Sequence, residues 1–176
     1  REDARQKLGI APQPKVLLHL GLLQRYKGIS TLLSAFIQLK DQNVLLLIAG
    51  MCPDPDLLAE IEQATRIDPR IVTRLEFIPH EDIQIYMNAC DWVVLPYETI
   101  LNSSSALLAL SFGRPVIVPH KGSITELITD GKQGYCYSYN RDLASAISRA
   151  LATSVEHWQQ MCANAYDLAH KYDWSK

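Results

Sequence analysis

Short apolar runs alternate along this chain with longer amphipathic segments, and this alternation restricts the fold more than any other feature. The runs are of strand length, and Gly or Pro follows most of them; they cover residues 16–20, 44–49, 71–77, 92–95, 116–118 and 135–137. Near-continuous apolar runs are typical of parallel strands that are covered on both faces. The segments between them carry apolar residues at helical spacing. The sequence therefore predicts an α/β fold: a Rossmann-like, doubly wound parallel sheet with helices on both faces and further helices at the C-terminus.

Polar residues mark where several of these helices should begin. Asp54 stands directly before a proline, which is typical of an N-cap followed by the first helical position. Ser123 with Glu126, and Thr153 with Glu156, have the spacing of a capping box. We therefore expect helices to start directly after Asp54, Ser123 and Thr153.

Composition narrows the class of protein. The chain has 176 residues, of which 48% are hydrophobic and 20% charged, and this predicts one folded domain over residues 1–176. The formal net charge is -2, so the chain lacks the excess of basic residues that is typical of nucleic-acid-binding proteins. The longest apolar run, residues 44–52, falls far short of the roughly 20 residues that a membrane span needs. Because the chain opens with charged residues and has neither a signal peptide nor an initiator methionine, we expect a piece of a longer protein.

The four cysteines stand far apart, at Cys52, Cys90, Cys136 and Cys162. Zinc sites need closely spaced pairs, and a disulfide framework is expected in short secreted chains. We therefore expect four unpaired, small hydrophobic side chains and a cytoplasmic protein.

The predicted fold already points to a binding site. Ligands of open α/β sheets bind beyond the carboxyl ends of the strands, at the point where the strand order reverses. In a Rossmann-like order this crevice lies between the first and fourth strands, whose following loops are Gly21–Gly28 and Pro96–Ser105. The first loop carries Lys27, and the second ends in the N-cap residues 102–105 ahead of an apolar helical segment. A lysine facing a helix N-terminus suits a phosphate.

Taken one at a time, these motifs have ordinary alternatives. The first loop is neither a Walker A loop nor a Gly-x-Gly-x-x-Gly fingerprint, and residues 102–105 fit a simple helix cap. Asp54 and Asp56 resemble a metal-binding Asp-x-Asp, but their position before a helix favours capping. Glu126 is in the same way a capping carboxylate first, and Arg114 precedes its strand at the wrong end of the sheet. The five histidines do not cluster, and His19 lies inside a predicted strand.

The order of several stretches is more specific than any single motif. They are Leu18–Gly28, Leu45–Gly50, Phe77–Pro79, Tyr86–Tyr97, Ala109–Ile117 and Gly122–Gly134. Together they resemble the carboxyl-terminal domain of the group 1 glycosyltransferases, which have the GT-B architecture. The resemblance covers nearly the whole chain in the right order.

The resemblance implies a domain that holds a nucleotide-sugar donor, while a separate amino-terminal domain, absent here, holds the acceptor. The full-length enzyme would transfer a hexose-type sugar from a nucleoside diphosphate to a saccharide or lipid acceptor with retention, and this fragment alone would be inactive and without catalytic residues. By likeness, Lys27 contacts the diphosphate, the backbone of 77–79 lies beside the base, and the helix start at Ser103–Ser105 receives the phosphates. No cofactor or metal is implied. The only route to a membrane surface would be the missing half, and nucleic acid is not an expected partner.

The donor-binding residues expected on this basis are Gly21, Lys27, Ile78, Glu98, Ser103, Ser104 and Ser105. Two departures from the family pattern affect them. Leu22 replaces an arginine after the first glycine, and Ile100 and Leu108 replace a pair of glutamates; Ser104 also stands where glycine is common. Glu98 and Arg25 are close enough in sequence to substitute.

These departures leave two further readings open. One is a non-catalytic binding or scaffolding homologue with a degraded donor site, and the other is an unrelated nucleotide-binding α/β domain.

At the other end of the chain, the final helix carries Tyr172 and Trp174, which we expect to form an exposed apolar patch against the missing half.

Overall fold

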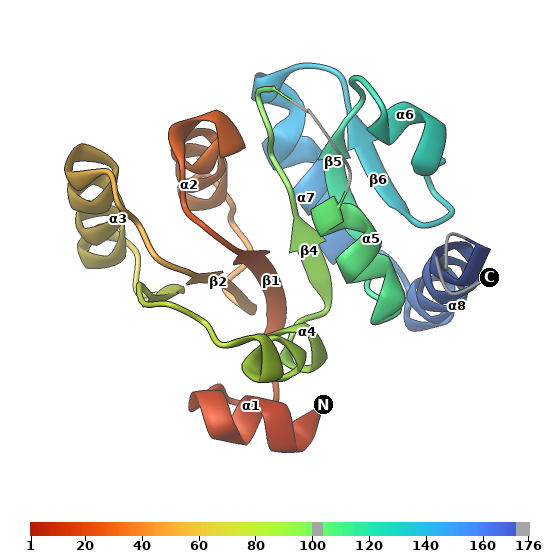
Figure 1. Ribbon diagram of the computed structural model, residues 1–176, viewed down its shortest axis with the longest axis horizontal. Helices are drawn as coiled ribbons and strands as arrows, with labels where there is room; N and C mark the ends of the chain where they lie inside the picture. The colour runs from red at the N-terminus through yellow and green to blue at the C-terminus, as the bar shows by residue number, and fades with distance from the viewer. Residues whose placement is uncertain (100–103, 172–176) are drawn as a thin grey trace.

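The computed structural model describes residues 1–99 and 104–171, and these contain a six-stranded sheet in which every pairing is parallel. The strands are β1 (Lys15–Leu20), β2 (Val44–Ala49), β3 (Ile71–Arg74), β4 (Trp92–Val94), β5 (Val116–Pro119) and β6 (Gly134–Tyr137). Their order is β3-β2-β1-β4-β5-β6 (Figure 1). The order reverses between β1 and β4, as the Rossmann-like prediction requires.

Helices cover both faces of the sheet, which confirms the predicted fold class. They are α1 (Glu2–Leu8), α2 (Ile29–Ile37), α3 (Pro55–Ile67), α4 (Ile83–Ala89), α5 (Ser104–Ser111), α6 (Ile124–Leu127), α7 (Leu143–Leu151) and α8 (Val155–Lys171), with short 3-10 turns at Arg25–Lys27, His80–Asp82 and Asn140–Asp142. Buried side chains of α2, α3 and α7 pack on one face, and those of α4, α5 and α6 on the other. The side chains of α8 reach both clusters. Within the described ranges, no helix has the length and apolarity to cross a bilayer.

The core follows from the alternation of side chains along each strand. Leu17 belongs to the cluster under α2, α3 and α7, whereas its neighbour Leu18 belongs to the cluster on the other face. Both are fully buried, and each such leucine contributes roughly 1.5–3 kcal/mol of hydrophobic stabilisation. On the first face, Trp92 and Tyr135 stack with ring centroids 5.6 Å apart. The sheet is therefore buried on both faces, as its apolar runs predict.

The third strand is shorter than predicted, since it ends at Arg74 rather than Phe77. Its ladder with β2 stops at the pair Ala49↔Arg74 because the chain turns at the next residue, Gly50. A Cβ on Gly50 would lie 1.9 Å from the Gly21 carbonyl oxygen, so the backbones of two loops touch there. Phe77 consequently lies beyond the strand and is 74% exposed.

The predicted helix starts have mixed outcomes. The Asp54 side chain accepts hydrogen bonds from the backbone N–H groups of Asp56 and Leu57, which confirms it as the N-cap of α3. Ser123 precedes α6 but its side chain makes no capping hydrogen bond. The start after Thr153 is wrong by one residue, because α8 begins at Val155.

Ser154 takes the capping role at α8. Its hydroxyl accepts from the His157 backbone N–H at 3.2 Å. The Thr153 hydroxyl instead donates to the Arg149 carbonyl at 2.9 Å and lies 3.0 Å from the Tyr135 hydroxyl. Thr153 therefore closes the end of α7 instead of opening α8. Tyr172 and Trp174, and with them the expected exposed patch, lie outside the described residues.

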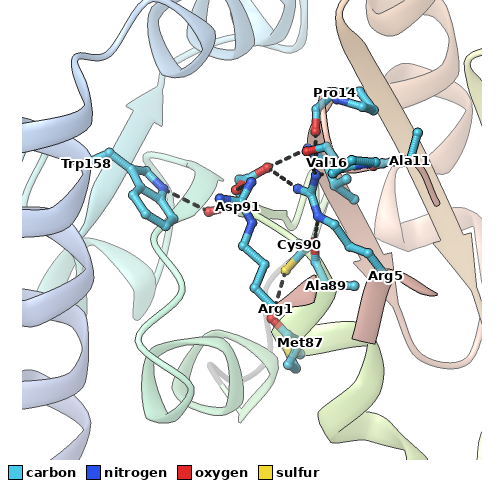
Figure 2. A network of polar contacts seen from close by, with 11 residues as sticks. Arg1, Arg5, Ala11, Pro14, Val16, Met87, Ala89, Cys90, Asp91 and Trp158 are labelled. Atoms are coloured by element: carbon cyan, nitrogen blue, oxygen red, sulfur yellow. Dashed lines mark hydrogen bonds and ion pairs between the residues drawn. The ribbon is translucent and has the colours of Figure 1, made fainter. Parts of the chain in front are cut away.

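A buried ion pair anchors α1 at the amino-terminal end of the sheet (Figure 2). Arg5 is 2% exposed, and its guanidinium donates to a carboxylate oxygen of Asp91 at 2.8 Å and to the Ala89 carbonyl at 3.0 Å. The same carboxylate oxygen accepts from the Val16 backbone N–H at 2.7 Å, while the Trp158 indole donates to the Asp91 carbonyl at 3.1 Å. One aspartate thus joins α1, β1, the start of β4 and α8. In Figure 1, α1 lies at the end of the molecule opposite the loop that follows β4.

Candidate functional site

The loops that follow β1 and β4 meet at the point where the strand order reverses. The ladder between these strands consists of the pairs Leu17↔Trp92 and Leu18↔Val93. Beyond it, the backbone N–H of Glu98 donates to the Tyr26 carbonyl at 2.9 Å. A Cβ on Gly28, whose φ is 70°, would lie 1.9 Å from the Pro96 carbonyl oxygen. The structure therefore brings together the two loops that the sequence predicts to flank the crevice.

Gly21 and Lys27 lie side by side in the first of these loops. Gly21 has a φ of 127°, and a Cβ placed on it would be 3.5 Å from the Lys27 Nζ atom. The ammonium group therefore lies in van der Waals range of the position that a side chain on Gly21 would take. Among the described residues the Lys27 ammonium has no hydrogen-bond or ion-pair partner. Partial burial lowers the pKa of Lys27, which is the behaviour of a cation that has lost water and gained no counter-charge.

Arg25, which the sequence offers as a substitute for the arginine that the family has at the position of Leu22, makes an exposed ion pair in this structure. Its guanidinium donates to the Asp54 carboxylate at 2.8 and 3.3 Å. Asp54 is held in turn by the backbone N–H of Leu57, and this bond together with Arg25 keeps the pKa of the Asp54 carboxyl below its usual range. Arg25 and Asp54 therefore connect the first loop to the start of α3.

Within residues 1–99 and 104–171, no group of three or more His, Cys, Asp or Glu side chains is placed to hold a metal ion.

The positions where the family has its paired glutamates offer no carboxylate. Leu108 is half-buried in α5 and packs against the core on that face of the sheet. Ile100 lies outside the described residues. Glu98 is exposed, and its charge contributes, after burial, to raising the pKa of the Tyr137 hydroxyl. The charge of Glu98 is therefore felt at the carboxyl end of β6, and its role in sugar recognition stays a prediction.

The remaining predicted residues lie around the same edge of the sheet. Ser104 and Ser105 form the first turn of α5, and Ser105 lies beside the buried Tyr97 hydroxyl. Ser103 lies outside the described residues. Ile78 is half-buried between β3 and α4 and packs on the core. None of these placements tests donor binding.

One residue at the crevice had no predicted role. His19 is fully buried near the end of β1, and its Nδ1 atom lies 2.9 Å from the Val94 carbonyl oxygen. Its Nε2 atom has no hydrogen-bond partner among the described residues. The signal in the sequence was a polar residue inside an apolar strand, one position before the strand ends. That signal alone could not say which neighbours the ring would meet.

The fold and the crevice define a class of protein. The doubly wound parallel sheet has the start of a helix and an ammonium, unpaired among the described residues, beside the point of strand reversal. Such an α/β domain is suited to an anionic ligand such as a phosphate. The Glycosyl transferases group 1 family model matches residues 1–168. The chain belongs to this family, which confirms the resemblance and excludes an unrelated nucleotide-binding domain.

Curated relatives match over part of their length. A GDP-mannose:glycolipid 4-beta-D-mannosyltransferase of Xanthomonas campestris is 32% identical over 142 residues, which are 81% of this chain and 41% of the relative. An alpha-monoglucosyldiacylglycerol synthase of Streptococcus pneumoniae is 30% identical over 157 residues, which are 88% of this chain and 35% of that protein. The chain therefore spans less than half the length of these relatives.

Solved structures share the fold. The complex of Anabaena HepE with UDP-glucose superposes with a TM-score of 0.84 at 24% identity, over 97% of this chain and 47% of that one. The C-terminal domain of a group 1 family glycosyl transferase, LpcC, of Francisella tularensis superposes with a TM-score of 0.86 at 21% identity, over 100% of this chain and 94% of that one. The domain thus corresponds in fold to a carboxyl-terminal domain of larger glycosyl transferases.

Proposed function

We propose that this chain is the donor-binding half of a glycosyltransferase that moves a sugar from a nucleoside diphosphate sugar to a saccharide or lipid acceptor. The observation that carries the proposal is the half-buried Lys27 ammonium, which has no partner among the described residues and lies over Gly21 at the crevice. A cation in this state gains most from an anion that replaces the water it has lost. The α5 helix start at Ser104 adds the positive end of a helix dipole at the same crevice.

In this proposal, Lys27 and the start of α5 stabilise the diphosphate as the bond to the sugar breaks. The developing charge on the leaving nucleotide meets a fixed ammonium and helix N–H groups, which need no reorganisation at that moment. No metal or cofactor is required for this step, so we propose a metal-free site. The acceptor would be bound by a separate amino-terminal domain, and the greater length of the relatives is enough to include one.

The names of relatives support the substrate class. One relative is named for GDP-mannose and a glycolipid, another for a monoglucosyldiacylglycerol, and the HepE structure contains UDP-glucose. We therefore favour a hexose nucleotide as donor and a lipid-linked or saccharide acceptor. Retention of the anomeric configuration stays a prediction, since the relatives' names include both alpha and beta linkages. The coupling constant of the product's anomeric proton would test it. A cytoplasmic location, with peripheral attachment to a membrane through the other half, is part of the same proposal.

A second function is favoured by the residues that the crevice lacks. Leu22 and Leu108 cannot bind a phosphate or a hydroxyl, and Arg25 is held by Asp54. A binding or scaffolding homologue that keeps the fold and has lost donor handling would show these features. The two proposals differ in whether a nucleotide sugar binds and is consumed when the acceptor domain is present.

We expect the isolated domain to bind nucleoside diphosphates weakly, with a Kd near or above ~1 mM. Each missing charge-assisted hydrogen bond costs roughly 1.5–3 kcal/mol, and the chain lacks those of the arginine and the glutamates. A saturation-transfer NMR screen of UDP, GDP and their sugars, followed by titration, measures this affinity. Glucose alone serves as the unbound control. A micromolar Kd would contradict the weakened site, while no binding of any nucleotide would favour the scaffolding homologue.

A further inference from the structure

His19 lies buried near the carboxyl end of β1, just beyond the last pair of the ladder between β1 and β4. The last pair of their ladder is Leu18↔Val93, and His19 follows directly. Instead of a backbone ladder, the His19 side chain connects the strands here, with Nδ1 2.9 Å from the Val94 carbonyl oxygen. The ring is fully buried, so its two nitrogen atoms must find their partners within the protein or in a bound molecule.

The contact with Val94 determines which nitrogen carries the proton. A carbonyl oxygen only accepts hydrogen bonds, so Nδ1 must donate, and in a neutral imidazole Nε2 is then a bare acceptor. Burial, with the nearby charge of Lys27 as a smaller cause, lowers the pKa of His19 to about 4, so the ring is neutral near pH 7. Nε2 has no partner among the described residues. A buried acceptor without a donor is unfavourable and calls for an explanation.

Lys27 is the neighbouring side chain that can donate a hydrogen bond to His19 Nε2. Because side chains alternate along a strand, His19 shares the face of Leu17, which is the face covered by α2. Lys27 directly precedes Gly28 and α2, and its ammonium lies over Gly21, two positions after His19. The charge of Lys27 acts on His19, and the ammonium group has no partner of its own among the described residues. A donor and an acceptor, both unpaired within the part of the chain that the structure describes, thus lie beyond the same end of β1.

We propose that His19 is a positioning residue of the donor site. When a diphosphate is bound, the Nε2 atom of His19 accepts one hydrogen bond from the Lys27 ammonium. The other N–H groups of the ammonium then face the phosphate oxygens. This inference rests on the proposed function. The neutral ring fixes the direction of the ammonium without adding or removing charge. His19 itself need not touch the nucleotide.

Two substitutions separate the two nitrogen atoms. The amide nitrogen of asparagine can stand where Nδ1 stands, so His19→Asn keeps the bond to Val94 and removes Nε2. The longer glutamine can place its amide oxygen where Nε2 stands, so His19→Gln restores the acceptor for Lys27 and gives up the bond to Val94. His157→Asn, on the exposed side of α8, is the matched control. Thermal unfolding of each variant confirms that it is folded before binding is measured.

The test is a titration of wild type and variants with UDP and with GDP, followed by amide NMR shifts. We expect His19→Asn to lower the affinity for whichever of the two nucleotides the wild type binds by about tenfold. This is the effect of losing one hydrogen bond to a charged group. His19→Gln should stay within about twofold of wild type, which a purely structural role would not produce, and His157→Asn should match wild type. In the wild type, the Nε2 nitrogen signal of His19 should move upfield, away from that of a free imine nitrogen, as nucleotide is added.

Each other outcome overturns the inference in a recognisable way. If the wild type binds a nucleotide and His19→Asn binds it equally well, or if the Nε2 signal does not move at saturation, His19 does not position Lys27. If His19→Gln loses as much affinity as His19→Asn, the ring is structural. If the wild type binds neither UDP nor GDP, the proposed function fails and the role of His19 fails with it.

Discussion

Replacing Lys27 with alanine is expected to remove measurable binding of nucleoside diphosphates by the isolated domain. The ammonium is a cation of the first loop without a partner among the described residues, whereas Leu22 carries no charge and Arg25 is paired with Asp54 at 2.8 Å. A charge-assisted hydrogen bond to phosphate is worth roughly 1.5–3 kcal/mol, so affinity should fall by about 10–100-fold. From a Kd near ~1 mM, a fall toward ~100-fold leaves no measurable binding, whereas a roughly tenfold fall remains visible in the initial slope of the titration.

The measurement is an NMR titration with UDP and GDP. Lys27→Arg keeps the positive charge and should retain part of the affinity, whereas Lys40→Ala, an exposed lysine between α2 and β2 at the other end of the sheet, should leave affinity unchanged. Binding by Lys27→Ala that equals wild type would remove Lys27 from the site. It would also leave the crevice without the cation on which the proposed function depends.

Replacing Asp91 with alanine should have the largest effect on stability, a loss of about 3–5 kcal/mol in the free energy of unfolding. The substitution leaves the Arg5 guanidinium, which is 2% exposed, without its charged partner. It also removes the acceptor of the Val16 backbone N–H at the start of β1. Burial already lowers the pKa of Arg5, with the Asp91 charge opposing that shift, so the cation depends on this carboxylate.

Urea unfolding followed by circular dichroism measures this loss. Glu62→Ala is the matched control, because its ion pair with Arg66 is exposed and spans 3.7 Å, and pairs of this kind contribute at most about 1 kcal/mol. A loss below about 1 kcal/mol for Asp91→Ala would mean that the buried pair adds little to the anchoring of α1. Nucleotide binding should survive in the folded fraction, since the pair lies at the opposite end of the sheet from the crevice.

The fold could be predicted because its causes are local. Apolar runs covered on both faces and amphipathic segments between them are visible in the sequence, and they led to the strand order that places β1 beside β4. The end of β3 could not be predicted in this way. It depends on the close approach of Gly50 to the Gly21 backbone, a contact between two loops. The predicted start of α8 was wrong because two neighbouring hydroxyls could cap this helix. Only the structure shows that the Ser154 hydroxyl does so.

The meeting of the two loops was predictable from the sequence, and their contacts were less so. The rule for parallel sheets located both loops, and the structure joins them through Glu98 and Tyr26. The pairing of Arg25 with Asp54 spans 29 positions of sequence, and no local pattern announces it. His19 was overlooked because a buried histidine in a strand is usually a satisfied core residue. Its unpaired Nε2 atom became visible only with its neighbours in place.

The most direct measurement of donor binding by the two loops is a map of backbone amide shifts as UDP or GDP is added to the domain. We expect the largest changes in residues 21–28, 97–99 and 104–105, on the two loops that meet beyond β1 and β4. Amides near Asp91, at the opposite end of the sheet, serve as internal controls and should not move. Changes confined to that opposite end, with residues 21–28 unaffected at saturating nucleotide, would show that the two loops do not form the donor site.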